Sequence, residues 1–372
     1  MPMMMLILDG LTDDPAEILG GKTPFQAADC KHLLHMKQYG AYGKFLTVPQ
    51  GFEVDSLTCI ATLLGVPSQT LPTGRAYLEA VSAGIALTEE DAVCRCNLVS
   101  VDAQGILQSS CAADLSDMQK KNELYKRVTH ENFKFYPIGG YKNLLVLKNS
   151  AGQINKICTY PPHQHLGEPI SKLLPQGNAL AQRLSEFALQ NCWKDENSAH
   201  THMLLPWDVT VKQNLPSFAE LHNLSGAAVC ATEIVRGIAL AMGLTVVTPQ
   251  GATADADTDL TAKVCTALTL VQDYDFILVH VNGTDELSHR CDAVGKAAFL
   301  QRIDAELVAP FIEQAPQDTT FLVCSDHSTI SATGRHRADP QPFILYNNSK
   351  QQHGNLGTRN ALQAISLLKG LI

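Results

Sequence analysis

The residues best suited to chemistry follow an apolar segment near the end of the chain. Thr320–Val323 is typical of a buried strand, and Asp326 and His327 come soon after it, with His336 nine residues later. A carboxylate and imidazoles packed beside a buried strand lose their hydration, which costs several kcal/mol unless something compensates. A divalent cation compensates because it takes these side chains as ligands. The pattern therefore predicts a metal site.

Two further segments place metal-type side chains after apolar strands. Asp9 follows the strand expected at Met3–Leu8, and Asp285 comes a few residues after Phe276–Val281. Asp285 and His289 have the i, i+4 spacing that puts both on one face of a helical turn. Such a pair alone is more often a surface pair, but three segments of this kind rarely coincide by chance. Three aspartates and three histidines suit two divalent ions, and mixed oxygen and nitrogen ligands suit Mn²⁺ or Zn²⁺ better than Ca²⁺.

Ser56 is a candidate for a bridging oxygen. It precedes Leu57–Leu64, an apolar segment that predicts a buried helix ending at Gly65. Backbone N–H groups and the macrodipole favour an anion at such a helix start. On this feature alone, Ser56 is better explained as an N-cap serine. Bound to a cation, however, a serine hydroxyl loses its proton readily and becomes a nucleophile toward a phosphoryl group.

The segments that position these residues alternate strands and helices at both ends of the chain. In the C-terminal part we expect helices at 231–242, 259–270 and 296–313, and strands at 245–247, 276–281, 320–324 and 342–346. This alternation predicts a mostly parallel sheet flanked by helices, with ligands at the carboxyl ends of the strands. Residues 81–224 instead alternate short apolar runs with turn-rich ones. We therefore expect a core from residues 1–80 and 225–372, with an inserted α+β domain from residues 81–224.

Composition narrows the class of protein. With 372 residues and 45% hydrophobic content, the chain has ample material for a large core. The net charge of −9 argues against a nucleic-acid or anionic-membrane partner. Eleven cysteines without a Cys-x-x-Cys pair indicate reduced thiols. No apolar stretch reaches the ~18 residues of a membrane span, so we expect a cytoplasmic protein.

The ordered motifs of the chain resemble those of a known family. They are Leu8-Asp9-Gly10, Gly21-Lys22-Thr23-Pro24, Thr73-Gly74-Arg75, Cys94-Arg95-Cys96-Asn97, Asp285-x3-His289, Asp326-His327-Ser328-Thr329 and His336-x2-Asp339-Pro340. The set resembles the cofactor-independent phosphoglycerate mutases of the archaeal type, within the alkaline phosphatase superfamily. The resemblance implies an alkaline-phosphatase-like core, a substrate-binding cap at 81–224, two divalent ions (Mn²⁺ first, Zn²⁺ or Mg²⁺ as alternatives) and no bisphosphoglycerate. It also implies interconversion of 2- and 3-phosphoglycerate, small phosphorylated metabolites, through a phosphoserine.

By matching position, the resemblance implies a role for each candidate residue. Ser56 would be the nucleophile. One metal would be held by Asp9, Ser56, Asp326 and His327, and the other by Asp285, His289 and His336. The substrate-binding candidates are Arg75, Arg95, Arg236 and His163, although a loop histidine such as His163 is more often simply exposed.

Two departures from the family pattern leave alternatives for the substrate. The polar partners that usually follow the family serine are replaced within Ser56–Ile60, and Ser109–Asp114 stands where the family cap is rich in arginine. Serine and cysteine cannot reproduce the bidentate grip of arginine on phosphate or carboxylate. The alternatives to a mutase are a phosphomonoesterase or phosphotransferase for another small phosphate ester, and a non-catalytic relative that keeps the fold and the metals.

Overall fold

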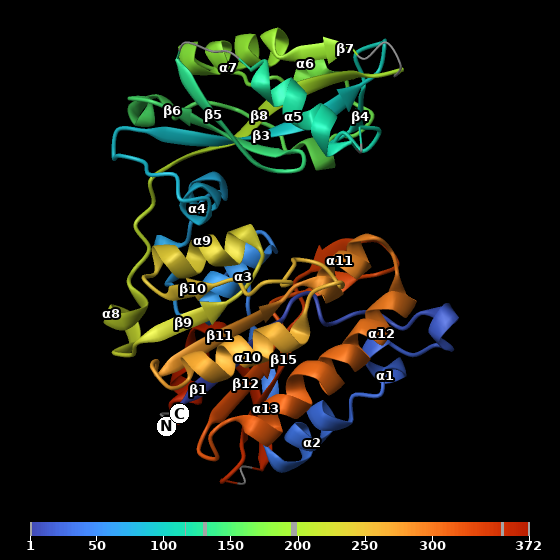
Figure 1. Ribbon diagram of the computed structural model, residues 1–372, viewed down its shortest axis with the longest axis vertical. Coiled ribbons are helices and arrows are strands. Elements are labelled where there is room, and N and C mark those ends of the chain that lie inside the picture. The colour runs from blue at the N-terminus through green and yellow to red at the C-terminus, as the bar shows by residue number, and fades with distance from the viewer. Residues whose placement is uncertain (1, 116, 129–131, 195–198, 351–352, 371–372) are drawn as a thin grey trace. The chain divides into compact units, whose positions relative to one another are not determined.

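The computed structural model describes residues 2–115, 117–128, 132–194, 199–350 and 353–370 (Figure 1). The chain forms two compact units. We call Met1–Pro72 with Asn214–Ile372 the core unit, and Thr73–Gln213 the inserted unit. No helix among the described residues has the length and apolar character needed to cross a membrane.

The unit boundaries differ from the predicted ones, which followed residues 80 and 224. Helix α4 (Ala76–Ser82) belongs to the inserted unit because it packs on that unit's strands, and Tyr77 N donates to Thr210 Oγ1 at 3.0 Å. Helix α8 (Phe218–His222) belongs to the core unit because Phe218 stacks on Phe276 with ring centroids 4.7 Å apart. Both exceptions are short helices whose partners are distant in sequence.

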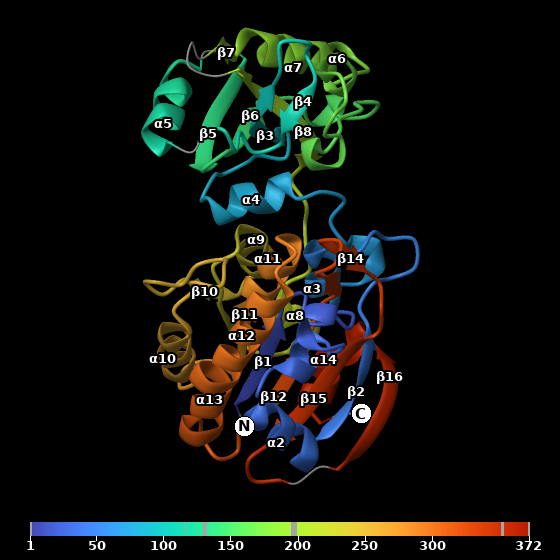
Figure 2. The same cartoon turned by 90° about the vertical axis from the view of Figure 1, so that its right-hand side faces the viewer.

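The core unit is built on an eight-stranded sheet of order β10-β9-β11-β1-β12-β15-β2-β16. The strands are β10 (Thr245–Val247), β9 (Gly226–Val229), β11 (Phe276–Val281), β1 (Met3–Leu8), β12 (Thr320–Cys324), β15 (Gln341–Asn347), β2 (Ala41–Leu46) and β16 (Gly354–Asn360). Only β15 runs antiparallel to its neighbours in this sheet, and Figure 2 shows β2 and β16 at its edge. The mostly parallel sheet predicted from the alternating elements is confirmed.

The three central strands explain where side chains with chemistry gather. Every residue of β11, β1 and β12 is buried, as expected for parallel strands covered on both faces. The strands are in register, with Leu6 opposite Val279 on one side and Val323 on the other. Their carboxyl ends therefore meet at one edge, where α/β sheets place their ligands.

Helices cover both faces of this sheet. One layer, in front of the sheet in Figure 1, contains α1 (Pro24–Ala27), α2 (Lys31–Tyr39), α10 (Leu260–Leu270), α12 (Ala293–Ile303) and α13 (Ala309–Gln314). The other contains α3 (Ser56–Leu63), α9 (Glu233–Ala241) and α14 (Ala364–Leu368). The helix expected at 296–313 is α12 and α13 joined by a π-helical turn at Asp304–Val308.

The inserted unit has an α+β arrangement. Its antiparallel strands are β5 (Phe133–Gly139), β6 (Lys142–Leu147), β3 (Ala92–Val101), β8 (Thr201–Val211) and β7 (Cys192–Lys194), with β4 (Leu107–Ser109) paired to β3. Its helices include α4, α5 (Met118–Lys126), α6 (Ile170–Leu173) and α7 (Ala179–Gln190). Leu180, Leu184 and Phe187 of α7 enter the core of this unit.

Candidate metal centre

Asp9 and Asp326 lie next to each other at the carboxyl edge because β1 and β12 pair in parallel. Each carboxylate has one oxygen held by the protein. Asp326 Oδ1 accepts from the N–H groups of Gly10 and His327 at 3.1 and 2.9 Å, and Asp9 Oδ2 accepts from His280 Nε2 at 2.9 Å. The other oxygens, Asp9 Oδ1 and Asp326 Oδ2, are buried without a hydrogen-bond partner among the described residues. They lie 3.5 and 3.3 Å from His327 Nε2.

These orphaned oxygens test whether a cation fits here. Burial, together with repulsion from the Asp326 carboxylate, raises the pKa of Asp9 well above its ordinary value. Two buried carboxylates that face one imidazole nitrogen need a positive charge or a proton between them. A divalent ion would supply that charge, with Asp9, Asp326 and His327 as its ligands. We call Asp9, Asp326 and His327 the Asp9 group.

A second group consists of Asp285 and His289 on α11 (Gly283–His289) and His336 on β14 (Arg335–Arg337), and we call it the Asp285 group. Asp285 Oδ2 lies 3.2 Å from His289 Nε2, and its Oδ1 lies 3.4 Å from His336 Nε2. The two Nε2 atoms are 3.1 Å apart. Figure 2 shows α3, α11 and β14 at the carboxyl edge of the sheet.

The tautomers in the Asp285 group favour a cation. His289 Nδ1 faces the carbonyl of Gly334 at 2.8 Å, and His336 Nδ1 faces that of Val54 at 3.2 Å. A carbonyl only accepts, so each Nδ1 carries a proton, and in the neutral rings both Nε2 lone pairs point at each other and at Asp285. Carbonyl partners on the outer nitrogen are the usual way in which proteins orient metal-binding histidines.

Without a cation, protons take its place. The hydrogen bond to Asp285 raises the pKa of His289 to about 9, although burial opposes the shift. Burial also lowers the pKa of His336, but Asp285 outweighs it and the net shift is upward. Burial raises the pKa of Asp285, yet hydrogen bonds from His289 and His336 hold it well below its usual range. The group is thus arranged around positive charge.

Thr329 and His327 connect the two groups. Thr329 Oγ1 donates to Asp285 Oδ1 at 2.6 Å, so it accepts from His327 Nδ1 at 3.2 Å. His327 Nε2 is then left bare toward the Asp9 group. Two sets of three residues each bring their ligand atoms within 4.8 Å of one another, Asp9/Asp326/His327 and Asp285/His327/His336. His327, predicted for one metal only, is within reach of both.

Gly10 makes the close approach of the groups feasible. Its φ is +62°, and a Cβ at this position would lie 2.6 Å from Thr329 Oγ1 and 2.8 Å from Asp285 Oδ1. A larger residue would be strained by its backbone conformation and would displace Asp285.

Ser56 is the first residue of α3 and brings its hydroxyl to the Asp9 group. Asp55, not Ser56, is the N-cap, and its carboxylate accepts from Thr58 N at 2.7 Å. The N-cap explanation of Ser56 is therefore wrong. Ser56 Oγ instead lies 3.2 Å from His327 Nε2, and because that nitrogen is bare, the hydroxyl donates to it.

The substrate-binding candidates divide between the units. In the inserted unit, the Arg95 guanidinium stacks over Trp207 at 4.3 Å, and its Nε lies 3.0 Å from Glu79 Oε2. The ring of His163 contacts Trp207 with centroids 5.8 Å apart, and Arg75 Nε is 3.8 Å from the other oxygen of Glu79. These residues form one cluster.

Arg236 lies in the core unit and does not belong to that cluster. Its Nη1 donates to Thr248 Oγ1 at 2.8 Å, just after β10. It is therefore positioned from α9, near the carboxyl ends of β9 and β10.

Three further residues, to which the sequence assigned no role in the site, support the candidate residues. Asp208, with a left-handed φ of 54°, accepts from the N–H groups of Arg75 and Ala76 at 2.9 Å and so orients the start of α4. Thr329 and His280 hold metal-ligand candidates. His280 is fully buried, and burial lowers its pKa to about 3. Strand pairing places it against Asp9, which periodicity alone could not reveal.

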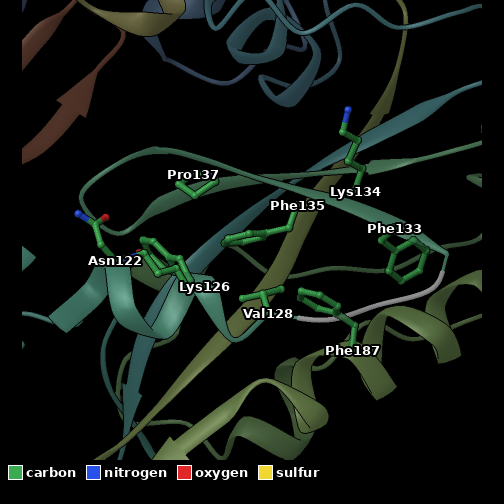
Figure 3. Close-up of a pocket in the computed structure, with 9 residues that line it drawn as sticks. Asn122, Lys126, Val128, Phe133, Lys134, Phe135, Pro137 and Phe187 are labelled. Atoms are coloured by element: carbon green, nitrogen blue, oxygen red, sulfur yellow. The ribbon is translucent and has the colours of Figure 1, made fainter. Parts of the chain in front are cut away.

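Two of the cavities in the described residues are lined by no metal-ligand candidate. One, of about 580 Å³, lies in the inserted unit (Figure 3). Phe133 and Phe187 in its wall belong to the core of that unit. The other, of about 640 Å³, lies in the core unit and includes Leu8 and Cys324.

Comparison with known proteins identifies the family. The profile of the metalloenzyme superfamily matches residues 1–368. The chain is 31% identical to a 2,3-bisphosphoglycerate-independent phosphoglycerate mutase from Methanosarcina mazei, over 96% of this chain and 93% of the relative. This chain belongs to the 2,3-bisphosphoglycerate-independent phosphoglycerate mutase family. A probable mutase of this family from Geobacter sulfurreducens is 30% identical, with the same coverage of 96% and 93%.

Solved structures agree with the fold of this phosphoglycerate mutase-like enzyme. A protein from Pyrococcus horikoshii superposes with a TM-score of 0.77 and 23% identity, covering all of this chain and 97% of that one. The cofactor-independent phosphoglycerate mutase of Thermoplasma acidophilum gives a TM-score of 0.61 and 18% identity, covering 100% and 99%. The predicted family and fold are confirmed, and with them a phosphotransferase that binds divalent metal.

Proposed function

We propose that this enzyme interconverts 2-phosphoglycerate and 3-phosphoglycerate through a phosphoserine on Ser56. The observation that carries the proposal is the position of the Ser56 hydroxyl, 3.2 Å from His327 Nε2, where the two ligand groups meet. A hydroxyl held at that junction is suited to nucleophilic attack rather than to capping a helix.

Two divalent ions fit the ligand groups. Asp9, Ser56, Asp326 and His327 would hold one, and Asp285, His289 and His336 the other, with His327 near both. The mixed oxygen and nitrogen donors favour Mn²⁺, with Zn²⁺ or Mg²⁺ as alternatives. When bound, such ions neutralise phosphoryl oxygens and lower the pKa of a hydroxyl that contacts them.

The residues of the chain then divide the chemistry between two transfers. In the first, Ser56 Oγ gives up its proton and forms a bond to phosphorus, while the 3-oxygen of the glycerate leaves and takes up a proton. In the second, the 2-hydroxyl of the retained glycerate loses its proton and forms a bond to the phosphorus of the phosphoserine, while the bond from phosphorus to Ser56 Oγ breaks and Ser56 Oγ takes up a proton. The phosphoryl group never leaves the site, so no bisphosphoglycerate is needed. The N–H groups at the start of α3 favour the anionic phosphoserine.

The inserted unit is proposed as a substrate-binding cap. Arg75, Arg95 and His163 would bind the glycerate portion, and Arg236 of the core unit the phosphoryl group. Trp207 fixes the plane of the Arg95 guanidinium, which suits bidentate recognition of a carboxylate. All eleven cysteines are free, which supports a reducing, cytoplasmic location.

The test is a product assay with the Mn²⁺-loaded protein, 3-phosphoglycerate and no bisphosphoglycerate. We expect 2-phosphoglycerate without release of inorganic phosphate. Release of phosphate in place of 2-phosphoglycerate would identify a phosphomonoesterase. Neither product, alongside an active relative, would contradict the proposal.

A further inference from the structure

We propose that His280 is a positioning residue for the Asp9 group: it holds one oxygen of Asp9 so that only the other is presented to a cation. The inference rests on the proposed metal site and adds a residue that does not itself bind the ion. It starts from the hydrogen bond between His280 Nε2 and Asp9 Oδ2, which is 2.9 Å long and joins two fully buried side chains.

Strand pairing fixes this contact. His280 lies opposite Ile7 in the parallel pair of β11 and β1. Asp9 comes two residues after Ile7, so its side chain leaves the same face of the sheet, where diagonal neighbours meet. Both backbone polar groups of Asp9 are hydrogen-bonded: its N–H donates to Val281 O at 3.0 Å, and its carbonyl oxygen accepts from Thr284 Oγ1.

The two carboxylates of the Asp9 group are arranged in the same way but held differently. Each has one oxygen occupied and one buried oxygen without a hydrogen-bond partner among the described residues, facing His327. Asp326 is held by the backbone N–H groups of Gly10 and His327, which remain when either side chain is changed to any residue other than proline. Asp9 Oδ2 is held by the imidazole of His280 alone, as far as its described hydrogen bonds show. His280 is therefore the point at which this orientation can be tested.

Chemistry fixes the tautomer of His280. As a metal ligand Asp9 must be ionised, and an ionised carboxylate only accepts, so Nε2 carries the ring proton, and Nδ1, buried without a hydrogen-bond partner among the described residues, is bare. The backbone of His280 is also held, because the buried Lys263 donates from Nζ to the carbonyl oxygen of His280 at 2.9 Å. The ring thus directs one N–H at Asp9. Partners of this kind outside the ligand shell typically contribute about 10- to 100-fold to metal affinity.

The test compares His280→Leu, which removes the donor, with His280→Gln, whose amide N–H reaches about the same place as Nε2. Both are made in a His289→Ala background, where the Asp285 group is weakened and Mn²⁺ titration reports the Asp9 group. We expect His280→Leu to lower Mn²⁺ affinity about 10- to 100-fold and His280→Gln to restore most of it. The matched control is His202→Leu, because His202 is also buried and its Nε2 contacts Asp114 Oδ2 at 3.0 Å, but in the inserted unit.

Each outcome decides the matter. Unchanged Mn²⁺ affinity in His280→Leu would overturn the positioning role, as would an equal loss in His280→Gln with both variants folded by circular dichroism. An equal loss in His202→Leu would show that the effect is general destabilisation and would also overturn it. If neither the His289→Ala parent nor the unmutated chain binds Mn²⁺, the proposed metal site itself is contradicted, and with it the positioning role of His280.

Discussion

At the scale of single residues, Thr329 connects the two ligand groups through one hydroxyl. It donates to Asp285 and accepts from His327, so it fixes a carboxylate in one group and a tautomer in the other. This double role distinguishes Thr329 from His280, which contacts only the Asp9 group.

Replacing Thr329 by the isosteric valine should weaken both groups. We expect Thr329→Val to lower Mn²⁺ affinity at each by about 10-fold or more, since both hydrogen bonds are lost. Isothermal titration of the metal-free protein measures this. Thr333→Val is the control, because Thr333 is exposed in the same segment and the one hydrogen bond described for its hydroxyl is with Ile330 O at 3.4 Å. Wild-type affinity at both groups in Thr329→Val would contradict the connecting role.

The sequence predicted the candidate ligands because strand ends can be recognised from apolar runs and side-chain type. It could not assign His327 to both groups, nor find His280 and Thr329. Their roles depend on which residues lie opposite one another across paired strands. Ser56 was ambiguous for a local reason: the N-cap role belongs to Asp55, one residue earlier, and both residue types favour that position.

At the scale of elements, α12 holds together the loop that follows β1 and the strand β13 (Ser328–Ile330). The buried Lys296 on α12 donates from Nζ to Asp13 Oδ2 and to Thr329 O, both at 3.0 Å. Asp13 also accepts from Ser331 N at 3.0 Å. This ion pair therefore joins three segments that surround the ligands.

Removing one partner of this pair should be costly. Lys296→Met leaves the Asp13 carboxylate buried and uncompensated, and we expect a loss of about 3–5 kcal/mol in the free energy of unfolding by urea. The control is Lys212→Met, which breaks the exposed pair with Glu89 (Nζ to Oε1, 2.7 Å), and should cost about 1 kcal/mol or less. Equal small losses in both variants would show that the buried pair does not secure the loop.

Asp91 at the start of β3 predicts a pH dependence for the inserted unit. Burial raises its pKa, but hydrogen bonds from Lys148 and from the N–H groups of Thr88 and Asn149 bring it down to about 2. Because the pKa of Asp91 is lower in the folded state than in the unfolded state, where it is about 3.9, its ionised carboxylate stabilises the folded state above that pH. This stabilisation is lost as pH falls toward 2. Acid unfolding of the inserted unit, followed by hydrogen exchange between pH 5 and 2, should be less steep in Asp91→Asn. An unchanged slope would contradict this assignment.

The sequence located five of the eight strands of the core sheet from their apolar runs, but it did not predict β2, β9 or β16. It did not show that β15 runs antiparallel, since the same residues suit either direction. The predicted boundary after residue 80 falls inside α4, because a short helix reveals its partners only through contacts such as that of Tyr77 with Thr210. Local pattern determines the type of an element, and its partners come from packing.

At the scale of the whole molecule, every metal-ligand candidate lies in the core unit, although the segments come from both ends of the chain. Bound metal would therefore tie the segment before the inserted unit to the one after it. Metal affinity is then folding free energy for the core unit in particular.

Metal removal should act on one unit only. Mn²⁺ at 100 times its dissociation constant stabilises the state that binds it by about 2.7 kcal/mol. Addition of EDTA to the loaded full-length protein should therefore speed hydrogen exchange in core-unit peptides that contain Asp9, Asp285 and Asp326, with little change in residues 73–213. Equal acceleration of hydrogen exchange in both units would contradict the prediction that bound metal stabilises the core unit in particular.

The most direct test of the central claim is to find where the phosphoryl group rests during turnover. The Mn²⁺-loaded protein is mixed with ³²P-labelled 3-phosphoglycerate, quenched within a turnover and digested for peptide mapping. We predict label on the peptide that contains Ser56, and neither label nor 2-phosphoglycerate with Ser56→Ala. Formation of 2-phosphoglycerate at the wild-type rate by Ser56→Ala, or label on another residue, would contradict the claim.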